Sequence, residues 1–200
     1  MRILFRWVSW PFIVLVVLVW VLLGPDFFLP KPSGYPHKMV ASAPIGGAFD
    51  LVDQNGRSVT DQDYKTPYKL IFFGFTACPS ICPSELLKMS DILTMLGSRA
   101  TRVTPLFITV DPARDTPQIL KTYTAKFDPR ITGLTGTSDQ VDRVVQKFRV
   151  YAARVDTPHG YTMDHSAFLY LTDAKNQMIT IYKIDQTADV IAADLRKRMD

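Results

Sequence analysis

The sequence predicts an α/β fold in which helices flank a mixed central sheet. Short apolar runs rich in β-branched and aromatic residues alternate with segments whose apolar residues recur at helical spacing. The last two strand-like runs are joined by Ala174-Lys175-Asn176, which is typical of a hairpin, and a final helix at 187–199 closes the chain. Strand–helix alternation followed by a hairpin and a helix indicates a mixed sheet with helices packed on it.

The expected strands are short runs bounded by turn residues. The first ends at the turn Asp53-Gln54-Asn55-Gly56, and Asp111-Pro112 ends the strand VTPLFITV. The run LIFFGF at 70–75 is apolar and aromatic, so it is expected to be the first central strand and to be buried. The full set of expected strands is 49–52, 70–75, 103–110, 131–136, 151–155, 166–173 and 177–184.

Four segments are expected to be helices, at 84–96, 116–127, 139–148 and 187–199. Thr116-Pro117 opens the second helix because proline fits a first helical turn, and Ser138 is expected to cap the third. This order of elements suits a thioredoxin-like fold. Such a fold places its reactive cysteines at the turn after the first central strand.

Both cysteines of the chain, Cys78 and Cys82, lie directly after that strand. Pro79 and Pro83 restrict the backbone, so the segment is expected to be a constrained turn with Pro83 at the start of the next helix. At the N-terminus of a helix, the backbone N–H groups without a partner in the helix and the helix dipole favour a thiolate over a thiol. Thiolate is both a nucleophile and the ligand of soft metals such as Cu(I) or Zn. The turn is therefore expected to carry the chemistry of the protein.

The C-x-x-x-C spacing of these cysteines is one residue wider than the C-x-x-C of thiol oxidoreductases. A wider loop suits a shared metal and still permits a disulfide. Two purely structural interpretations stay open. The cysteines could form a disulfide that cross-links the loop, or they could be a pair of buried, inert thiols. A disulfide that closes so short a loop constrains the unfolded chain little, so it would contribute little to the stability of the fold. Metal binding or redox chemistry is the preferred interpretation.

His165 is the candidate for a third ligand. His37 lies in a proline-rich segment and His159 in a Pro-Gly loop, so both are expected to be solvated surface residues. His165 stands just before the strand 166–173, which in a thioredoxin-like topology neighbours the first central strand, so His165 should face the cysteine turn. The alternative is a hydrogen-bonded structural histidine. Met163 is a soft donor nearby, but it is expected to pack in the core.

The N-terminus predicts a membrane anchor. Arg2 and Arg6 precede residues 7–23, which carry no charge and are flanked by tryptophans. The alternative is a cleaved signal peptide, but the small-residue triplet Ala41-Ser42-Ala43 lies too far beyond the apolar run for an ordinary cleavage site. The expected organisation is an anchor at 1–24, a proline-rich tether at 25–44 and a domain at 45–200.

Charge distribution predicts the orientation and excludes one class of partner. Basic residues before the span place the N-terminus in the cytoplasm and the domain outside, which in a bacterium is the periplasmic face of the inner membrane. The net charge of +4 and the isoelectric point near 9.1 are mild. No arginine-rich stripe interleaved with aromatic residues is present in the sequence, so nucleic acid is not an expected partner.

Three segments resemble the signature segments of the SCO/SenC family of membrane-anchored copper chaperones. They are GFTACPSICPSEL (74–86), TVDPARDTP (109–117) and YTMDHS (161–166), in the order and spacing of that family. The resemblance covers the whole part of the chain after the tether. It implies a thioredoxin-like fold, a mononuclear copper site, and a role in maturing the dinuclear copper centre of cytochrome c oxidase.

The resemblance also implies the ligands of that site, which are Cys78, Cys82 and His165. The thiolates would hold Cu(I), and the imidazole would matter more for Cu(II). The chain has Ser80 where the family usually has Asp, and Ala77 where many members have His. Neither position is a ligand in the family, so these departures bear on partner docking or metal exchange.

Two aspartates match the acidic segment of the family. Asp111 is a candidate for orienting a ligand without touching the metal. Asp115 is expected to cap the turn after the strand.

The expected function is that of a periplasm-facing copper chaperone rather than an enzyme. Its partners would be the copper-accepting subunit of cytochrome c oxidase, and other copper donors or thiol reductases. One alternative is a thiol–disulfide oxidoreductase that reduces the cysteines of the acceptor before another protein delivers copper. Another is a redox sensor whose disulfide state signals to a partner. The chaperone and reductase both use Cys78 and Cys82, but only the chaperone needs His165.

Overall fold

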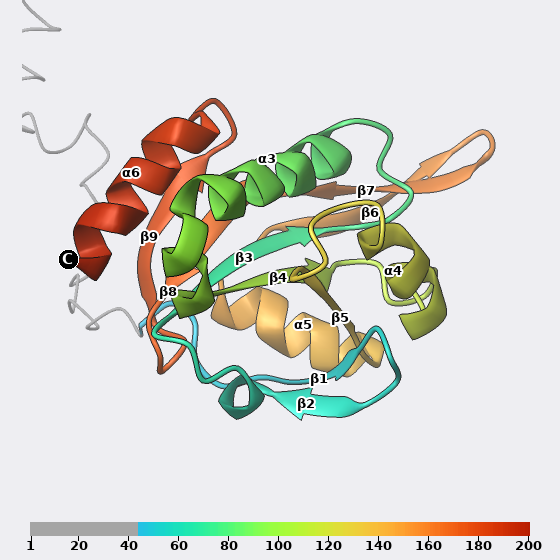
Figure 1. Ribbon diagram of the computed structural model, residues 1–200. Helices are drawn as coiled ribbons and strands as arrows, with labels where there is room; N and C mark the ends of the chain where they lie inside the picture. The colour runs from blue at the N-terminus through green and yellow to red at the C-terminus, as the bar shows by residue number, and fades with distance from the viewer. Residues whose placement is uncertain (1–43) are drawn as a thin grey trace, which may run out of the picture. The chain divides into compact units, whose positions relative to one another are not determined.

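The computed structural model describes residues 44–200, which form a mixed sheet with helices on its two faces (Figure 1). The expected membrane anchor, nearly all of the tether and His37 lie outside the described residues. Between residues 44 and 200, no helix has both the length and the apolar character needed to cross a membrane.

In this part of the chain, seven strands form one sheet in the order β2-β1-β5-β4-β3-β8-β9. Strand β3 is flanked by β4, which pairs with it in parallel, and by β8, which pairs with it antiparallel. The predicted mixed sheet is therefore present, and β8 neighbours β3 as expected. The bounds are β1 Asp50–Asp53, β2 Ser58–Thr60, β3 Tyr68–Gly74, β4 Val103–Thr109, β5 Thr132–Thr135, β8 Phe168–Thr172 and β9 Met178–Lys183.

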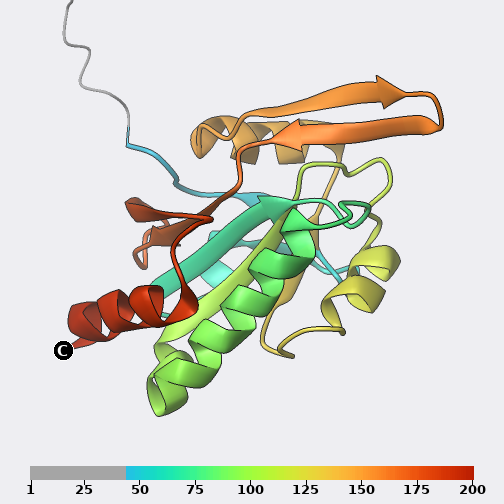
Figure 2. The same cartoon turned by 90° about the horizontal axis from the view of Figure 1, so that it is seen from above.

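Helices cover both faces of the sheet. Helices α3 and α6 pack together on one face, and α5 lies on the opposite face (Figure 2). Helix α4 packs beside β5. Their bounds are α3 Ile81–Leu96, α4 Pro117–Thr124, α5 Ser138–Lys147 and α6 Ala188–Met199, with short 3₁₀ helices at Asp61–Asp63 and Gly97–Arg102. This arrangement is the thioredoxin-like architecture that the order of elements predicts.

The first central strand is buried as its composition predicts. Residues 70–73 of β3 have no exposed surface, because helices and neighbouring strands cover both of their faces. The ring of Phe73 contacts Phe148 of the segment after α5 at 5.2 Å between centroids and Tyr170 of β8 at 5.5 Å. Phe72, which points to the other face, packs near Phe107 of β4. The strand thereby fixes the position of the loop that follows it.

Two helices differ from the expected bounds by three residues at one end. Helix α3 begins at Ile81 rather than Ser84, so Pro83 is its third residue. Proline is tolerated there because N–H groups of a first turn have no partner within the helix. Helix α4 ends at Thr124 rather than Phe127, because the Phe127 N–H donates to the Thr124 carbonyl at 3.0 Å in a tighter turn.

The cap of α5 and two strands also differ from expectation. Thr137, not Ser138, caps the helix, because Thr137 and Gln140 exchange side-chain to backbone hydrogen bonds in a capping box. Strand β2 was not expected and has only three residues. A further unexpected strand, β7 (Gly160–His165), pairs with β6 (Ala152–Thr157) in a hairpin outside the main sheet. None of its residues is fully buried, so its sequence carries no clear apolar pattern.

Gly74 allows α3 to begin close to the end of β3. A Cβ atom at this position would lie 2.8 Å from the Sγ of Cys82 and 2.9 Å from the Cε2 of Phe107. Both of those side chains are buried and have little room to move. The glycine is therefore required by close packing rather than by its backbone conformation.

We expect Gly74→Ala to destabilise the reduced protein by about 1–3 kcal/mol, because the added methyl group overpacks the core against Cys82 and Phe107. Urea unfolding followed by circular dichroism measures the change. A loss of less than about 0.5 kcal/mol would contradict the packing argument.

Candidate metal centre

The two cysteines lie in different environments although only three residues separate them. Cys82 is in the first turn of α3 and has no exposed surface, and its sulfur packs against Gly74. Cys78 lies in the loop before the helix and is half-buried. Its Sγ accepts a hydrogen bond from the backbone N–H of Cys82 at 3.4 Å. Both thiols are free, so the loop offers one buried and one accessible sulfur.

His165 lies beside the buried sulfur, on the side that the sequence argument predicts. It is the last residue of β7, and its Nε2 is 3.8 Å from the Sγ of Cys82. Its ring packs edge-on against Phe72 and Phe75, with centroids 6.2 and 5.7 Å away. Residues far apart in the sequence thus bring a thiol and an imidazole together.

The hydrogen bond of the other ring nitrogen indicates the tautomer of His165. Nδ1 lies 3.1 Å from the carbonyl oxygen of Ser166, which can only accept, so Nδ1 carries the proton. Nε2 then directs its lone pair towards Cys82. Burial lowers the pKa of His165, which favours the neutral form. A neutral imidazole with a free nitrogen is the form that binds metals.

The expectation that the helix N-terminus favours a thiolate does not hold at Cys82. Burial raises the pKa of the Cys82 thiol far above its usual value. A hydrogen bond with the Phe75 backbone lowers it, but by less than burial raises it. The loss of solvation therefore favours the thiol form of Cys82 over the thiolate.

Asp115 holds the cysteine loop in place, a role that the sequence analysis missed. Its N–H bonds the Asp111 carbonyl, so the expected turn is present. Its carboxylate, however, accepts hydrogen bonds from the N–H and hydroxyl of Thr76 at 3.0 and 2.5 Å, and from the Thr109 hydroxyl at 2.6 Å. Asp115 is fully buried, and burial raises its pKa. It therefore ties the residues just before Cys78 to the end of β4.

The other sequence-predicted residues have contacts of their own. The Asp111 carboxylate accepts a hydrogen bond from the Tyr161 hydroxyl at 2.9 Å and pairs with Arg114, so it contacts β7 rather than His165 itself. Met163 packs against the core, as expected. His159 is exposed at the tip of the β6–β7 hairpin, also as expected.

The described residues bring the proposed ligands near one another without completing a site. Between residues 44 and 200, no three His, Cys, Asp or Glu side chains already converge as a metal-binding group. Cys82 and His165 are adjacent, and the Cys78 sulfur faces the backbone of Cys82. Two sulfurs and one imidazole are donors that suit Cu(I), Cu(II) or Zn.

Comparison with known proteins assigns the chain to a family. The SCO1/SenC family model matches residues 37–200. A "SCO2-like protein" of Rickettsia felis is 43% identical over 155 residues, covering 76% of this chain and 76% of that protein.

Solved structures with the same fold include two informative neighbours. Bradyrhizobium japonicum ScoI, described with copper bound, has a TM-score of 0.71 and 44% identity, covering 76% of this chain and 98% of that one. BsSco, described as having a disulfide switch and as a member of the Sco family of cytochrome c oxidase assembly proteins, has a TM-score of 0.60 and 26% identity over 77% of this chain and 94% of that one. With a family model that spans the whole described domain and relatives above 40% identity, this chain belongs to the SCO1/SenC family.

Proposed function

We propose that this protein binds one copper ion through Cys78, Cys82 and His165 and delivers it during assembly of cytochrome c oxidase. The observation that carries the proposal is the 3.8 Å approach of His165 Nε2 to Cys82 Sγ, next to a second cysteine on the same loop. The description of the Bradyrhizobium relative with copper bound supports the choice of metal. The description of the Sco family as cytochrome c oxidase assembly proteins supports the choice of pathway. The acceptor would be the subunit that holds the dinuclear copper centre.

The two oxidation states of copper would depend on different ligands of the site. Two thiolates satisfy Cu(I), which accepts few, soft ligands. Cu(II) prefers more ligands and tetragonal geometry, so His165 would matter most for that ion. Copper binding would also overcome the raised pKa of the Cys82 thiol, because the cation replaces the proton. Cys78 is half-buried rather than enclosed, so it is the sulfur that an acceptor thiol would reach first.

A second function is favoured by the unequal exposure of the cysteines. An accessible thiol beside a buried one suits a dithiol that attacks a partner disulfide and then closes its own. The disulfide switch described for BsSco is consistent with such chemistry. In this alternative the protein would be a thiol–disulfide oxidoreductase or a redox sensor, and Asp111 and His165 would not take part in the chemistry.

We further propose that residues 1–24 anchor the chain in the inner membrane and that 25–44 tether the domain at 45–200 on the periplasmic side. Arg2 and Arg6 before the uncharged run at 7–23 support this orientation.

Cysteine substitution tests the copper site. Cys78→Ser or Cys82→Ser in the full-length protein should lower Cu(I) affinity by more than the roughly 10–100-fold typical of changes around a ligand, because a hydroxyl is a poor soft-metal ligand. Competition with a Cu(I) chelator gives the affinity, and metal analysis should give one copper per reduced monomer. Ser80→Ala, on the same loop, is the control. Full copper retention in either cysteine variant would rule out the site.

His165→Ala separates the chaperone from the reductase. Cu(I) binding should weaken only in part, whereas Cu(II) should lose most of its affinity because a direct ligand is gone. Oxidase assembly in cells should fail while the dithiol still reduces a model disulfide. Normal binding of both ions together with full oxidase activity would contradict the three-ligand site and favour the reductase.

Alkaline carbonate extraction tests the anchor. The protein should stay with the membrane pellet, because an uncharged span of this kind resists extraction that removes peripheral proteins. Recovery of all the protein in the soluble fraction, shortened to begin near residue 43, would instead show a cleaved signal peptide.

A further inference from the structure

The residue that would serve as the third ligand ends a hairpin that lies outside the main sheet. Strands β6 and β7 form a two-stranded ribbon that extends away from the rest of the described domain (Figures 1 and 2). An isolated two-stranded hairpin has little stability of its own. The position of His165 therefore depends on the contacts that fasten β7 to the body of the protein.

Arg114 makes the closest of these contacts. It lies in the loop between β4 and α4, and its Nε donates to the carboxylate of Asp111. Its Nη1 donates to the backbone carbonyl of Tyr161 on β7 at 2.8 Å. Its guanidinium carbon lies 3.8 Å from the centroid of the Tyr161 ring, a cation–π contact. The Tyr161 hydroxyl donates to Asp111 at 2.9 Å, so the three residues form a closed set of interactions.

Arg114 also reaches towards the cysteine loop. Its guanidinium lies 5.8 Å from the ring of Phe75, the residue that directly follows β3. The same ring packs edge-on against His165 at 5.7 Å. One side chain thereby contacts both the strand that carries His165 and the ring that supports the imidazole.

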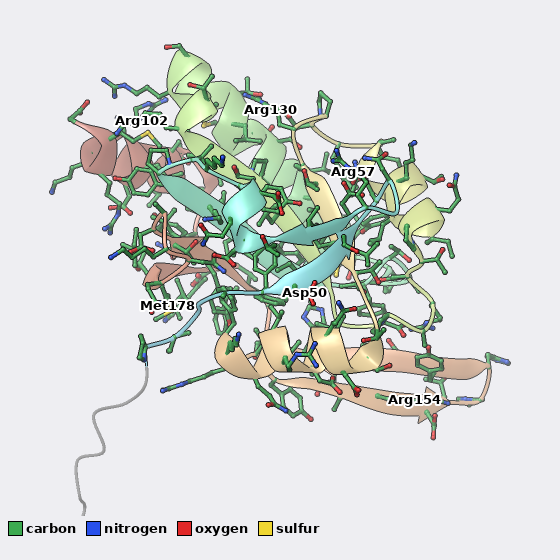
Figure 3. All side chains as sticks on the ribbon, turned by 90° about the horizontal axis from the view of Figure 1, so that it is seen from below. Asp50, Arg57, Arg102, Arg130, Arg154 and Met178 are labelled. Atoms are coloured by element: carbon green, nitrogen blue, oxygen red, sulfur yellow. The ribbon has the colours of Figure 1, made fainter. Side chains whose placement is uncertain are left out.

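Arg154 stacks on the same tyrosine ring but cannot fasten the hairpin. Its guanidinium lies 3.9 Å from the Tyr161 ring, and its ion-pair partner is Asp156 on its own strand. Figure 3 shows Arg154 on the hairpin, and 61% of its side-chain surface is exposed. It thus offers a matched comparison, with the same residue type and ring contact but no link to the β4–α4 loop.

We propose that Arg114, acting through Tyr161 and Asp111, is a positioning residue that holds His165 against Cys82 and thereby sets the affinity for Cu(II). This inference rests on the proposed function, since it assigns His165 as a copper ligand. Arg114 itself touches neither the metal nor the sulfurs in this scheme. Its main effect is expected on the imidazole, because Cys78 and Cys82 are held chiefly by β3, α3 and Asp115.

The test compares Cu(II) and Cu(I) binding in full-length variants. Arg114→Met should lower Cu(II) affinity by about 10–100-fold, the range found when groups that orient ligands are removed, and should alter the Cu(II) electron paramagnetic resonance spectrum. Cu(I) affinity should change far less, because the thiolates suffice for that ion. Arg114→Lys should behave like Arg114→Met. Lysine keeps the charge, but it lacks the planar guanidinium that donates to both the Asp111 carboxylate and the Tyr161 carbonyl.

Two further variants complete the design. Arg154→Met should leave the Cu(II) affinity and spectrum unchanged. Tyr161→Phe keeps the ring but loses the bond to Asp111, so it should give a smaller decrease in Cu(II) affinity and tests the contact with little risk to folding. Thermal unfolding of each reduced, metal-free variant measures the effect on stability separately.

Wild-type Cu(II) affinity and spectrum in both Arg114 variants and in Tyr161→Phe would overturn the inference. So would a loss of Cu(I) and Cu(II) affinity by the same factor, which indicates general destabilisation. His165→Ala, measured in parallel, separates the two hypotheses. If that variant bound Cu(II) as the wild type does, the proposed three-ligand site would fail and the inference with it. If His165→Ala lost Cu(II) but the Arg114 variants did not, only the inference would fail.

Discussion

The geometry of the site depends on the close packing of the first turn of α3 against the end of β3. Gly74 leaves room for the sulfur of Cys82, and the buried strand before it fixes where that sulfur lies. Because Cys82 is enclosed, the accessible sulfur of the pair is that of Cys78 in the loop. The unequal exposure of two sulfurs that are close in sequence follows from this single contact. An accessible sulfur next to a buried one is useful for both ligand exchange and thiol–disulfide exchange, which is why both functions start from the same loop.

Burial sets the charge state of the site before any metal arrives. It raises the pKa of the Cys82 thiol and lowers the pKa of His165, so both groups favour their neutral forms. A metal cation that binds there would displace the thiol proton. The metal-bound thiolate is stable in this poorly solvated site, whereas a thiolate without a cation is not. Low solvation around the proposed ligands would therefore favour a bound metal over a free thiolate.

The loop between β4 and α4 supports both halves of the site. Asp115 binds Thr76 and so holds the loop that carries Cys78. Four residues earlier, Asp111 binds Tyr161 of β7, the strand that ends in His165. The cysteines and the histidine come from elements that do not otherwise share a sheet, and this acidic loop links them. A substitution in this loop can therefore affect His165, the proposed ligand, although the loop does not contact its imidazole.

The sequence alone determined the elements with strong apolar patterns and the loop that joins two of them. The central strand, the helices, the mixed sheet and the approach of His165 to the cysteine turn were predicted, because apolar periodicity and element order decide which segments pair. Only the tertiary structure decided the features that depend on distant neighbours. Strand β7 pairs in a ribbon outside the main sheet and has no fully buried residue, so its sequence has no apolar face to reveal it. The start of α3 at Ile81, the raised pKa of Cys82, and the contacts of Asp115 and Arg114 arise from packing and desolvation, which involve residues brought together by the fold rather than by the local sequence.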